Sequence, residues 1–109
     1  MDGRSPNYAA FWPRYLREHG RPVTRALHYI GTALALTLLA VAILLGDWRL
    51  VPAAVVSGYL FAWVAHAAVE RNRPATFTHP WWSLISDFRM FGLWITGRLK
   101  AHLDEALRE

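Results

Sequence analysis

Two long apolar runs dominate the pattern of hydrophobic and polar positions along the chain. They cover residues 26–45 and 50–69, contain no Asp, Glu, Lys or Arg, and are separated only by Gly46-Asp47-Trp48-Arg49. A helix of about 20 apolar residues is long enough to cross the hydrocarbon core of a bilayer, so each run predicts a transmembrane helix. Because the turn between them is short, the two helices are expected to form an antiparallel hairpin.

Shorter amphipathic segments flank the hairpin on both sides. Residues 8–19 precede it, and the aromatic-rich segment 81–95 and the segment 98–109 follow it, all with apolar residues at helical spacing. These segments are too short or too polar to span a membrane and are expected to lie at its surface. The predicted fold class is an all-α membrane protein: a two-helix transmembrane hairpin with N- and C-terminal amphipathic interfacial helices, in a single domain of residues 1–109.

The charge distribution supports a membrane location and gives the hairpin a direction. The first run is too long for a typical signal peptide and is followed directly by a second span. Eleven of the twelve Lys and Arg residues flank the hairpin, and only Arg49 lies in the turn. By the positive-inside rule, both termini of this integral membrane protein face the cytoplasm, across the inner membrane if the chain is bacterial. Cations beside apolar spans favour contact with anionic membrane lipids over binding of nucleic acid.

Each apolar run carries a histidine at the end away from the turn. His28 lies roughly 26 Å along its helix from Leu45, and His66 roughly 24 Å from Leu50, at about 1.5 Å per residue. The hairpin should therefore bring the two imidazoles together at one depth. Glu70, four residues after His66, falls on the same helical face and adds a carboxylate there.

Two further histidines, His19 and His79, are expected near the same end of the hairpin, whereas His102 on the last segment is expected to be solvated. A lone histidine in a span can be a hydrogen-bonded packing group, but ionisable groups at membrane depth are often functional. Imidazoles with few carboxylates and no Cys suit iron, zinc or copper, and His and carboxylate ligands with open positions are typical of non-haem Fe(II) oxygen chemistry. The number of ligands favours one metal ion over a di-iron site.

Three charged residues near this site have more than one interpretation. Arg71 and Arg73 directly follow the second span, where they either anchor the helix at headgroup level or bind an acidic headgroup bidentately. Asp87 either orients a ligand histidine or pairs with one of these arginines, unless it lies on a solvated face. The sequence contains no serine-centred triad, glycine-rich phosphate loop or nucleotide motif, so metal-dependent chemistry is the candidate activity.

Several short motifs occur in a specific order between about Phe11 and Gly97. They are Tyr15-Leu16-Arg17-Glu18-His19, Arg25-Ala26-Leu27-His28-Tyr29-Ile30-Gly31, and Trp63-Val64-Ala65-His66 with Glu70 and Arg73-Pro74-Ala75. With these motifs the chain resembles the Mpo-like small membrane family, typified by the fungal 2-hydroxy fatty acid dioxygenase of phytosphingosine breakdown. Residues 70–77 and the later Trp82-Ser83-Leu84 and Asp87-Phe88-Arg89-Met90 resemble its bacterial branch.

The resemblance implies a non-haem iron enzyme that uses dioxygen to shorten a long-chain 2-hydroxy fatty acid by one carbon, an α-oxidation. It implies catalytic roles at Fe2+ for His19, His28, His66 and Glu70, and His79 matches the bacterial pattern as a further metal ligand. Arg71 and Arg73 are then the expected substrate-binding residues.

Two other functional classes remain open from the residues alone. A non-enzymatic membrane scaffold or assembly protein would use the histidines as packing groups and would bind no metal. A metal or proton transporter would use His66 and Glu70 as relay groups, but two spans would need a homo-oligomer to form a path. Metal analysis distinguishes the scaffold from the enzyme, and flux into liposomes distinguishes the transporter.

Overall fold

The computed structural model describes residues 5–74 and 78–108, and every regular element in these ranges is helical. In chain order the elements are α1 (Tyr8–Arg17), α2 (Pro22–Leu45), α3 (Leu50–Val64), the short π-helix η1 (Ala65–Glu70) that continues α3, α4 (Pro80–Ile95) and α5 (Leu99–Arg108). The predicted all-α fold class is confirmed.

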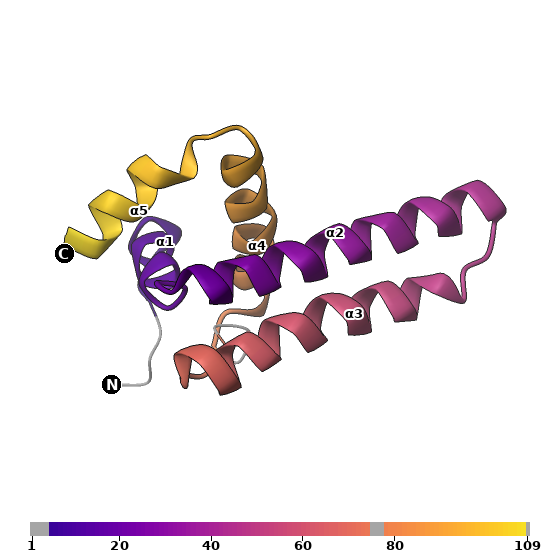
Figure 1. Ribbon diagram of the computed structural model, residues 1–109, viewed down its shortest axis with the longest axis horizontal. Helices are drawn as coiled ribbons and strands as arrows, with labels where there is room; N and C mark the ends of the chain where they lie inside the picture. The colour runs from indigo at the N-terminus through magenta and orange to yellow at the C-terminus, as the bar shows by residue number, and fades with distance from the viewer. Residues whose placement is uncertain (1–4, 75–77, 109) are drawn as a thin grey trace.

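The helices α2 and α3 form a long antiparallel hairpin that projects away from the other helices (Figure 1). Helix α2 begins at Pro22, before the apolar run itself, because proline is favoured at the first helical position. It ends at Leu45 and is capped by Gly46, whose φ of 64° is a conformation that glycine adopts at little cost. The two helices are thus antiparallel and joined by the short turn that the sequence predicts.

Both arms of the hairpin are long and apolar enough to cross a membrane. Pro22–Leu45 has 24 residues and Leu50–Glu70 has 21, and only 28% and 22% of their most apolar stretches are buried within the protein. The core helices of soluble proteins are mostly buried, so this exposed apolar surface is better suited to contact with lipid. Small residues bring the arms together: a Cβ added at Gly31 would lie 2.9 Å from Phe61 Cβ and 3.1 Å from the carbonyl oxygen of Gly58.

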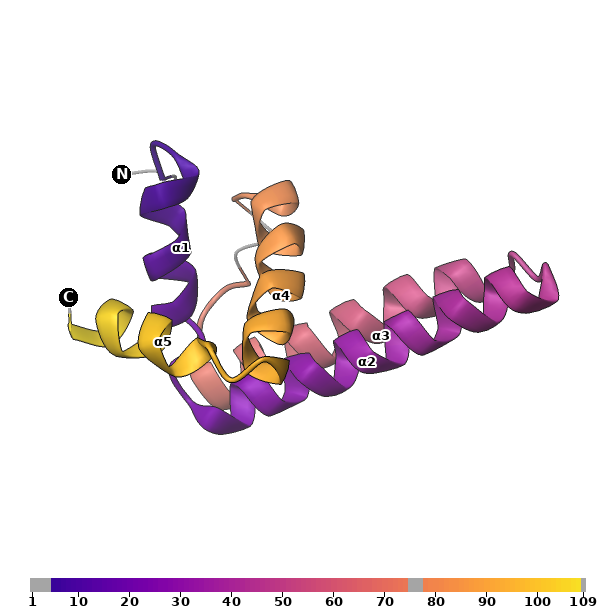
Figure 2. The same cartoon turned by 90° about the horizontal axis from the view of Figure 1, so that it is seen from above.

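The other three helices gather around the open end of the hairpin, where α2 begins and η1 ends (Figures 1 and 2). Helices α1 and α4 stand at a steep angle to the hairpin, the orientation expected of interfacial helices beside spans (Figure 2). Buried side chains of α1, α4, α5 and the first part of α2 form one hydrophobic core that consists of Phe11, Trp12, Tyr15, Leu16, Tyr29, Met90, Leu99 and Ala106. This core fixes α1 and α4 against the start of α2.

His102, which was predicted to be solvated, is half-buried in the structure. Helix α5 packs against α1, and Nδ1 of His102 accepts a hydrogen bond from Nε1 of Trp12 at 3.2 Å. The edge-on contact between the two rings makes His102 part of the helix packing.

Candidate metal centre

Three histidines from three different segments meet at the open end of the hairpin. Nε2 of His19 lies 3.0 Å from Nε2 of His28 and 3.1 Å from Nε2 of His66. The ring centroids of His28 and His66 are 5.2 Å apart, so the hairpin does bring these two residues together. Each side chain is at most 4% exposed. Because their candidate ligand nitrogens all lie within 4.8 Å of one another, the three histidines could hold one metal ion.

The turn between α1 and α2 positions His19 over His28. Nη1 of Arg25 donates to the carbonyl oxygens of His19 at 2.8 Å and of Gly20 at 3.0 Å. Arg25 lies one turn before His28 on α2, so this arginine holds the turn against the helix that carries the second histidine.

The π-helix η1 positions His66. Such π-helical turns are often found at functional sites, where the extra residue in the turn redirects a side chain. The turn closes at Arg71, which has a φ of 59°, a left-handed conformation that is costly for a residue other than glycine. The backbone N–H groups of Arg71 and Asn72 both point to the carbonyl oxygen of His66. This unusual ending places the side chain of Asn72 beside the ring of His66.

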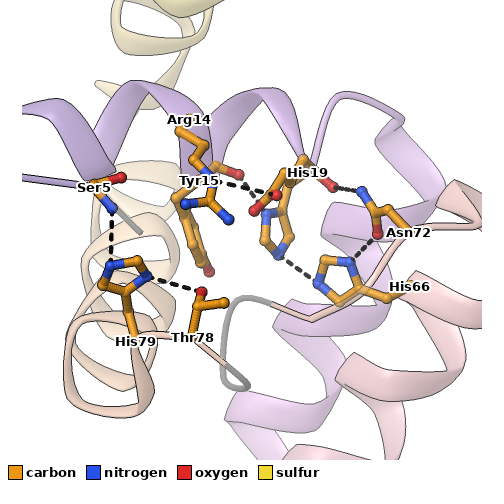
Figure 3. A network of polar contacts seen from close by, with 9 residues as sticks. Ser5, Arg14, Tyr15, His19, His66, Asn72, Thr78 and His79 are labelled. Carbon is orange, nitrogen blue, oxygen red and sulfur yellow. Dashed lines mark hydrogen bonds and ion pairs between the residues drawn. The ribbon is translucent and has the colours of Figure 1, made fainter. Parts of the chain in front are cut away.

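The second nitrogen of each ring, Nδ1, forms a hydrogen bond with an oxygen. Nδ1 of His19 lies 2.6 Å from the carbonyl oxygen of Tyr15, and Nδ1 of His28 lies 2.9 Å from that of Thr24. Nδ1 of His66 lies 2.6 Å from Oδ1 of Asn72 (Figure 3). Because these oxygens only accept hydrogen bonds, each Nδ1 carries the hydrogen, and each neutral ring has its lone pair on Nε2.

The Nε2 atom of His19 therefore faces the Nε2 atoms of His28 and His66 across about 3 Å, and no hydrogen lies between them. The lone pairs on these nitrogens repel one another. Protonation does not readily relieve this repulsion, because burial, with His28 and His66 nearby, lowers the pKa of His19 well below its usual value. A bound cation would relieve it. Histidines that bind metal through Nε2 commonly donate Nδ1–H to an oxygen in this way. The donor set therefore fits a first-row transition-metal ion.

The spacing of the nitrogens also fits a shared ion. Two nitrogens that each bind one ion at about 2.1 Å lie about 3.0 Å apart when the two bonds meet at a right angle. The separations of 3.0 Å and 3.1 Å match that value.

Glu70 lies outside this cluster. Its Oε2 accepts hydrogen bonds from the backbone N–H of Arg21 at 2.8 Å and from Oγ1 of Thr24 at 2.6 Å. The start of a helix has unsatisfied N–H groups and a partial positive charge, and Arg21 supplies no side-chain cap of its own. The structure therefore uses the predicted metal carboxylate as the cap of α2. Thr24 connects Glu70 to the histidine site, since its carbonyl oxygen accepts from His28.

His79 also lies apart from the three clustered histidines. Its Nε2 accepts from the backbone N–H of Ser5 at 3.1 Å, and its Nδ1 donates to Oγ1 of Thr78 at 2.9 Å. Figure 3 shows its ring turned towards these two residues. The ring stacks on Trp82 with centroids 5.1 Å apart. Both ring nitrogens are thus occupied, which leaves His79 no free lone pair for a metal in this arrangement.

The charged residues near the site have separate environments. Arg71 and Arg73 are exposed just beyond η1 and form no ion pair within the described part of the chain. Asp87 accepts a short hydrogen bond from the hydroxyl of Tyr15 instead of pairing with either arginine. Burial raises the pKa of Asp87 to about 7. The ring of Tyr15 stacks on His19 with centroids 4.1 Å apart, so Asp87 is connected to the cluster through Tyr15.

Sequence reasoning missed the three oxygens that orient the histidines. Tyr15 and Thr24 each precede their histidine by four residues, a spacing that places a backbone carbonyl beneath the ring in a helix. Asn72 follows His66 by six residues, which is not a helical spacing, and only the π-helical ending brings the two side chains together. The first two contacts had a sequence signal, and the third had none.

An apolar cavity of about 350 Å³ extends from the cluster along the hairpin. Its walls are residues between His28 and Leu39 on α2, between Ala54 and Ala62 on α3, and between Leu84 and Phe88 on α4. The volume is within the range of small-molecule sites. Asp87 also lines the cavity and is connected to His19 through Tyr15. The carboxyl group of Asp87 and the ring of His28 are therefore at the same end of the cavity.

Comparison with known proteins agrees with this description. No curated protein and no solved structure matches the chain. The family model described as 2-hydroxy-palmitic acid dioxygenase Mpo1-like matches residues 5–99, which include the three clustered histidines and the cavity. This match covers most of the 109 residues and confirms the resemblance read from the sequence motifs. The chain belongs to the Mpo1-like family.

Proposed function

We propose that this protein is an Fe(II)-dependent dioxygenase that shortens long-chain 2-hydroxy fatty acids by one carbon. The observation that carries the proposal is the convergence of three Nε2 lone pairs beside an apolar cavity that His28 lines. A polar reaction centre next to an apolar cavity suits an amphiphilic substrate, and the family description supports a 2-hydroxy fatty acid.

His19, His28 and His66 would hold the iron. When bound, Fe(II) supplies a chelation site for the carboxylate and hydroxyl of a 2-hydroxy acid and the means to activate dioxygen. All three ligands are neutral and would not reduce the positive charge of the ion, so an anionic substrate could neutralise it.

The remaining residues position the site and the substrate. The carbonyl oxygens of Tyr15 and Thr24 and the amide of Asn72 fix the three rings. Arg71 and Arg73 offer exposed positive charge beside η1, where a carboxylate can be attracted from the membrane surface. The three histidines are buried, so the fold keeps water away from the cluster.

Turnover of a defined substrate tests this function. Purified protein loaded with Fe(II) and supplied with dioxygen should convert a long-chain 2-hydroxy fatty acid into the acid one carbon shorter. His66→Ala should abolish conversion because one ring of the cluster is lost. His102→Ala, which removes a histidine outside the cluster, should retain it. If wild-type protein shown to hold iron forms no shortened acid from substrates of several lengths, the dioxygenase proposal is wrong, and a scaffold role becomes the leading alternative.

We also propose that both termini face the cytoplasm. The flanking helices α1, α4 and α5 lie at one end of the hairpin, which agrees with the location of eleven of the twelve cations outside the turn (Figure 1). Reporter fusions at each terminus should be active only in the cytoplasm. An external signal from either fusion would contradict this topology.

A further inference from the structure

The cavity beside His28 has a definite direction and length. On α2 its lining runs from His28 to Leu39, eleven residues, or about 16 Å at 1.5 Å per residue. His28 is the member of the metal cluster that lines the cavity at this end, and aliphatic side chains such as Val55 line it towards Leu39. The cavity therefore extends from the metal centre into the apolar part of the hairpin.

Two small residues lie where the arms of the hairpin meet, beside the midpoint of the cavity. Ala35 and Gly58 both line it, and a Cβ added at Gly58 would lie 3.7 Å from Cβ of Ala35. The two residues are thus opposite each other on α2 and α3. Ala35 is seven residues from His28, so this point is about 10 Å from the metal centre. The opposite helix leaves no room for a larger side chain at either position, so such a side chain would have to extend into the cavity that both residues line.

We propose that this cavity binds the acyl chain of the substrate and that Ala35 and Gly58 set the chain length it accepts. The proposal rests on the function proposed above, because the chelating head of a 2-hydroxy acid must lie at the His28 end. The lining also includes Thr32, Tyr59 and Asp87, but most of the other residues are apolar, and an acyl chain is the occupant that suits such walls over a length of about 16 Å. The hairpin exposes its apolar surface, which gives such a chain a route in from the lipid.

The length of the cavity predicts which acyl-chain length binds most tightly. An extended chain advances about 1.2 Å per bond, so about 16 Å accommodates roughly 13 bonds beyond the head group. Each buried methylene strengthens binding about fourfold. Affinity should therefore rise with chain length and level off at about 14 to 16 carbons.

Two variants should shorten the cavity, and one should lengthen it. Ala35→Leu and Gly58→Leu each place a branched side chain about 10 Å from His28, which leaves room for roughly eight bonds. Leu39→Ala removes a large side chain from the far end and should favour acids a few carbons longer, without adding bulk where α2 meets α3. Ala33→Leu is the matched control, because Ala33 is exposed on the same helix and does not line the cavity.

The experiment measures binding separately from turnover. A fluorescent fatty acid bound to the full-length protein in detergent is displaced by 2-hydroxy acids of 8 to about 20 carbons, without iron and with iron. In Ala35→Leu and Gly58→Leu, affinity for the 16-carbon acid should fall more than tenfold, while affinity for the 8-carbon acid stays unchanged. Ala33→Leu should behave as wild type.

The results separate this proposal from the proposed function. The acyl-chain assignment would be overturned if affinity depended on chain length in the same way in wild type, Leu39→Ala and the two shortening variants. That result is expected if a membrane lipid fills the cavity instead. Shifted binding profiles together with no shortened product would support the cavity and contradict the dioxygenase. If product forms but all variants have the same chain-length profile, the dioxygenase proposal is supported and the proposal that this cavity binds the acyl chain is overturned.

Discussion

Nδ1 of His66 donates a hydrogen bond of 2.6 Å to Oδ1 of Asn72, the second residue after the π-helix η1. Nδ2 of the same Asn72 donates to the carbonyl oxygen of Glu18 at 3.3 Å. One side chain thus connects the end of the second candidate span to the turn that carries His19. Asn72 fixes the orientation of His66 and its distance from the neighbouring ring.

Asn72→Ala is expected to weaken metal binding about 10- to 100-fold, because the residue that orients a metal-ligating histidine is lost. Asn72→Asp keeps an oxygen acceptor and should retain most of the affinity. Competition with a chelator of known Fe(II) affinity measures both effects. Equal affinities in wild type and Asn72→Ala would show that this hydrogen bond does not support the site.

Glu70→Ala distinguishes a helix cap from a metal ligand. Loss of the contacts to Arg21 and Thr24 should lower the free energy of unfolding by about 1 to 2 kcal/mol, as loss of a helix cap does. The metal content should remain that of the wild type. Glu105→Ala, at an exposed position on α5, is the control for thermal stability. Loss of metal at unchanged stability would instead identify Glu70 as a ligand.

Arg73→Ala should raise the KM for a 2-hydroxy fatty acid up to about tenfold with little change in kcat. A hydrogen bond to a charged group contributes about 1.5 kcal/mol, and a carboxylate contact acts on ground state and transition state alike. Arg98→Ala removes an exposed cation farther along the chain and should leave KM unchanged. A large fall in kcat for Arg73→Ala would contradict a role limited to substrate binding.

Asp87 should make the protein less stable as the pH rises towards neutrality. Burial raises its pKa in the folded protein to about 7, from about 3.9 in an unfolded chain. Folding therefore favours the protonated form of Asp87. Its contribution to the free energy of unfolding is complete below about pH 4 and is lost as the pH rises through about 7. The loss amounts to at most about 4 kcal/mol.

Asp87→Asn should remove this pH dependence, because the amide does not titrate. Thermal unfolding of the metal-free protein in detergent, between about pH 5 and 8, measures it. The difference in Tm between wild type and variant should grow with pH in favour of the variant. Asp104→Asn, exposed on α5, should show no such trend. A constant difference at every pH would contradict a raised pKa of Asp87.

The sequence predicted the features that depend on periodicity and length. The two apolar runs predicted the hairpin, and the equal distances of His28 and His66 from the turn predicted that their rings would meet. Helical spacing alone also predicted Glu70 at the same site. In the structure the carboxylate of Glu70 instead accepts hydrogen bonds from Arg21 and Thr24 at the start of α2, and its role as a metal ligand stays a prediction that Glu70→Ala tests.

Tertiary packing determined the remaining details of the site. His79 precedes α4 and is held by Ser5, from a distant part of the chain, so its position on the sequence did not reveal its partner. The contact of Asn72 with His66 depends on the left-handed Arg71, a backbone conformation that the residue type does not favour.

The central claim is that His19, His28 and His66 bind one iron ion through Nε2. Diffraction from protein loaded with Fe(II), combined with elemental analysis, tests it directly through the anomalous signal at the iron edge. The account predicts one iron per chain, with the anomalous peak about 2.1 Å from each of the three Nε2 atoms. A peak beside Glu70 or His79, or iron-free protein in which the three rings keep their present contacts, would contradict it.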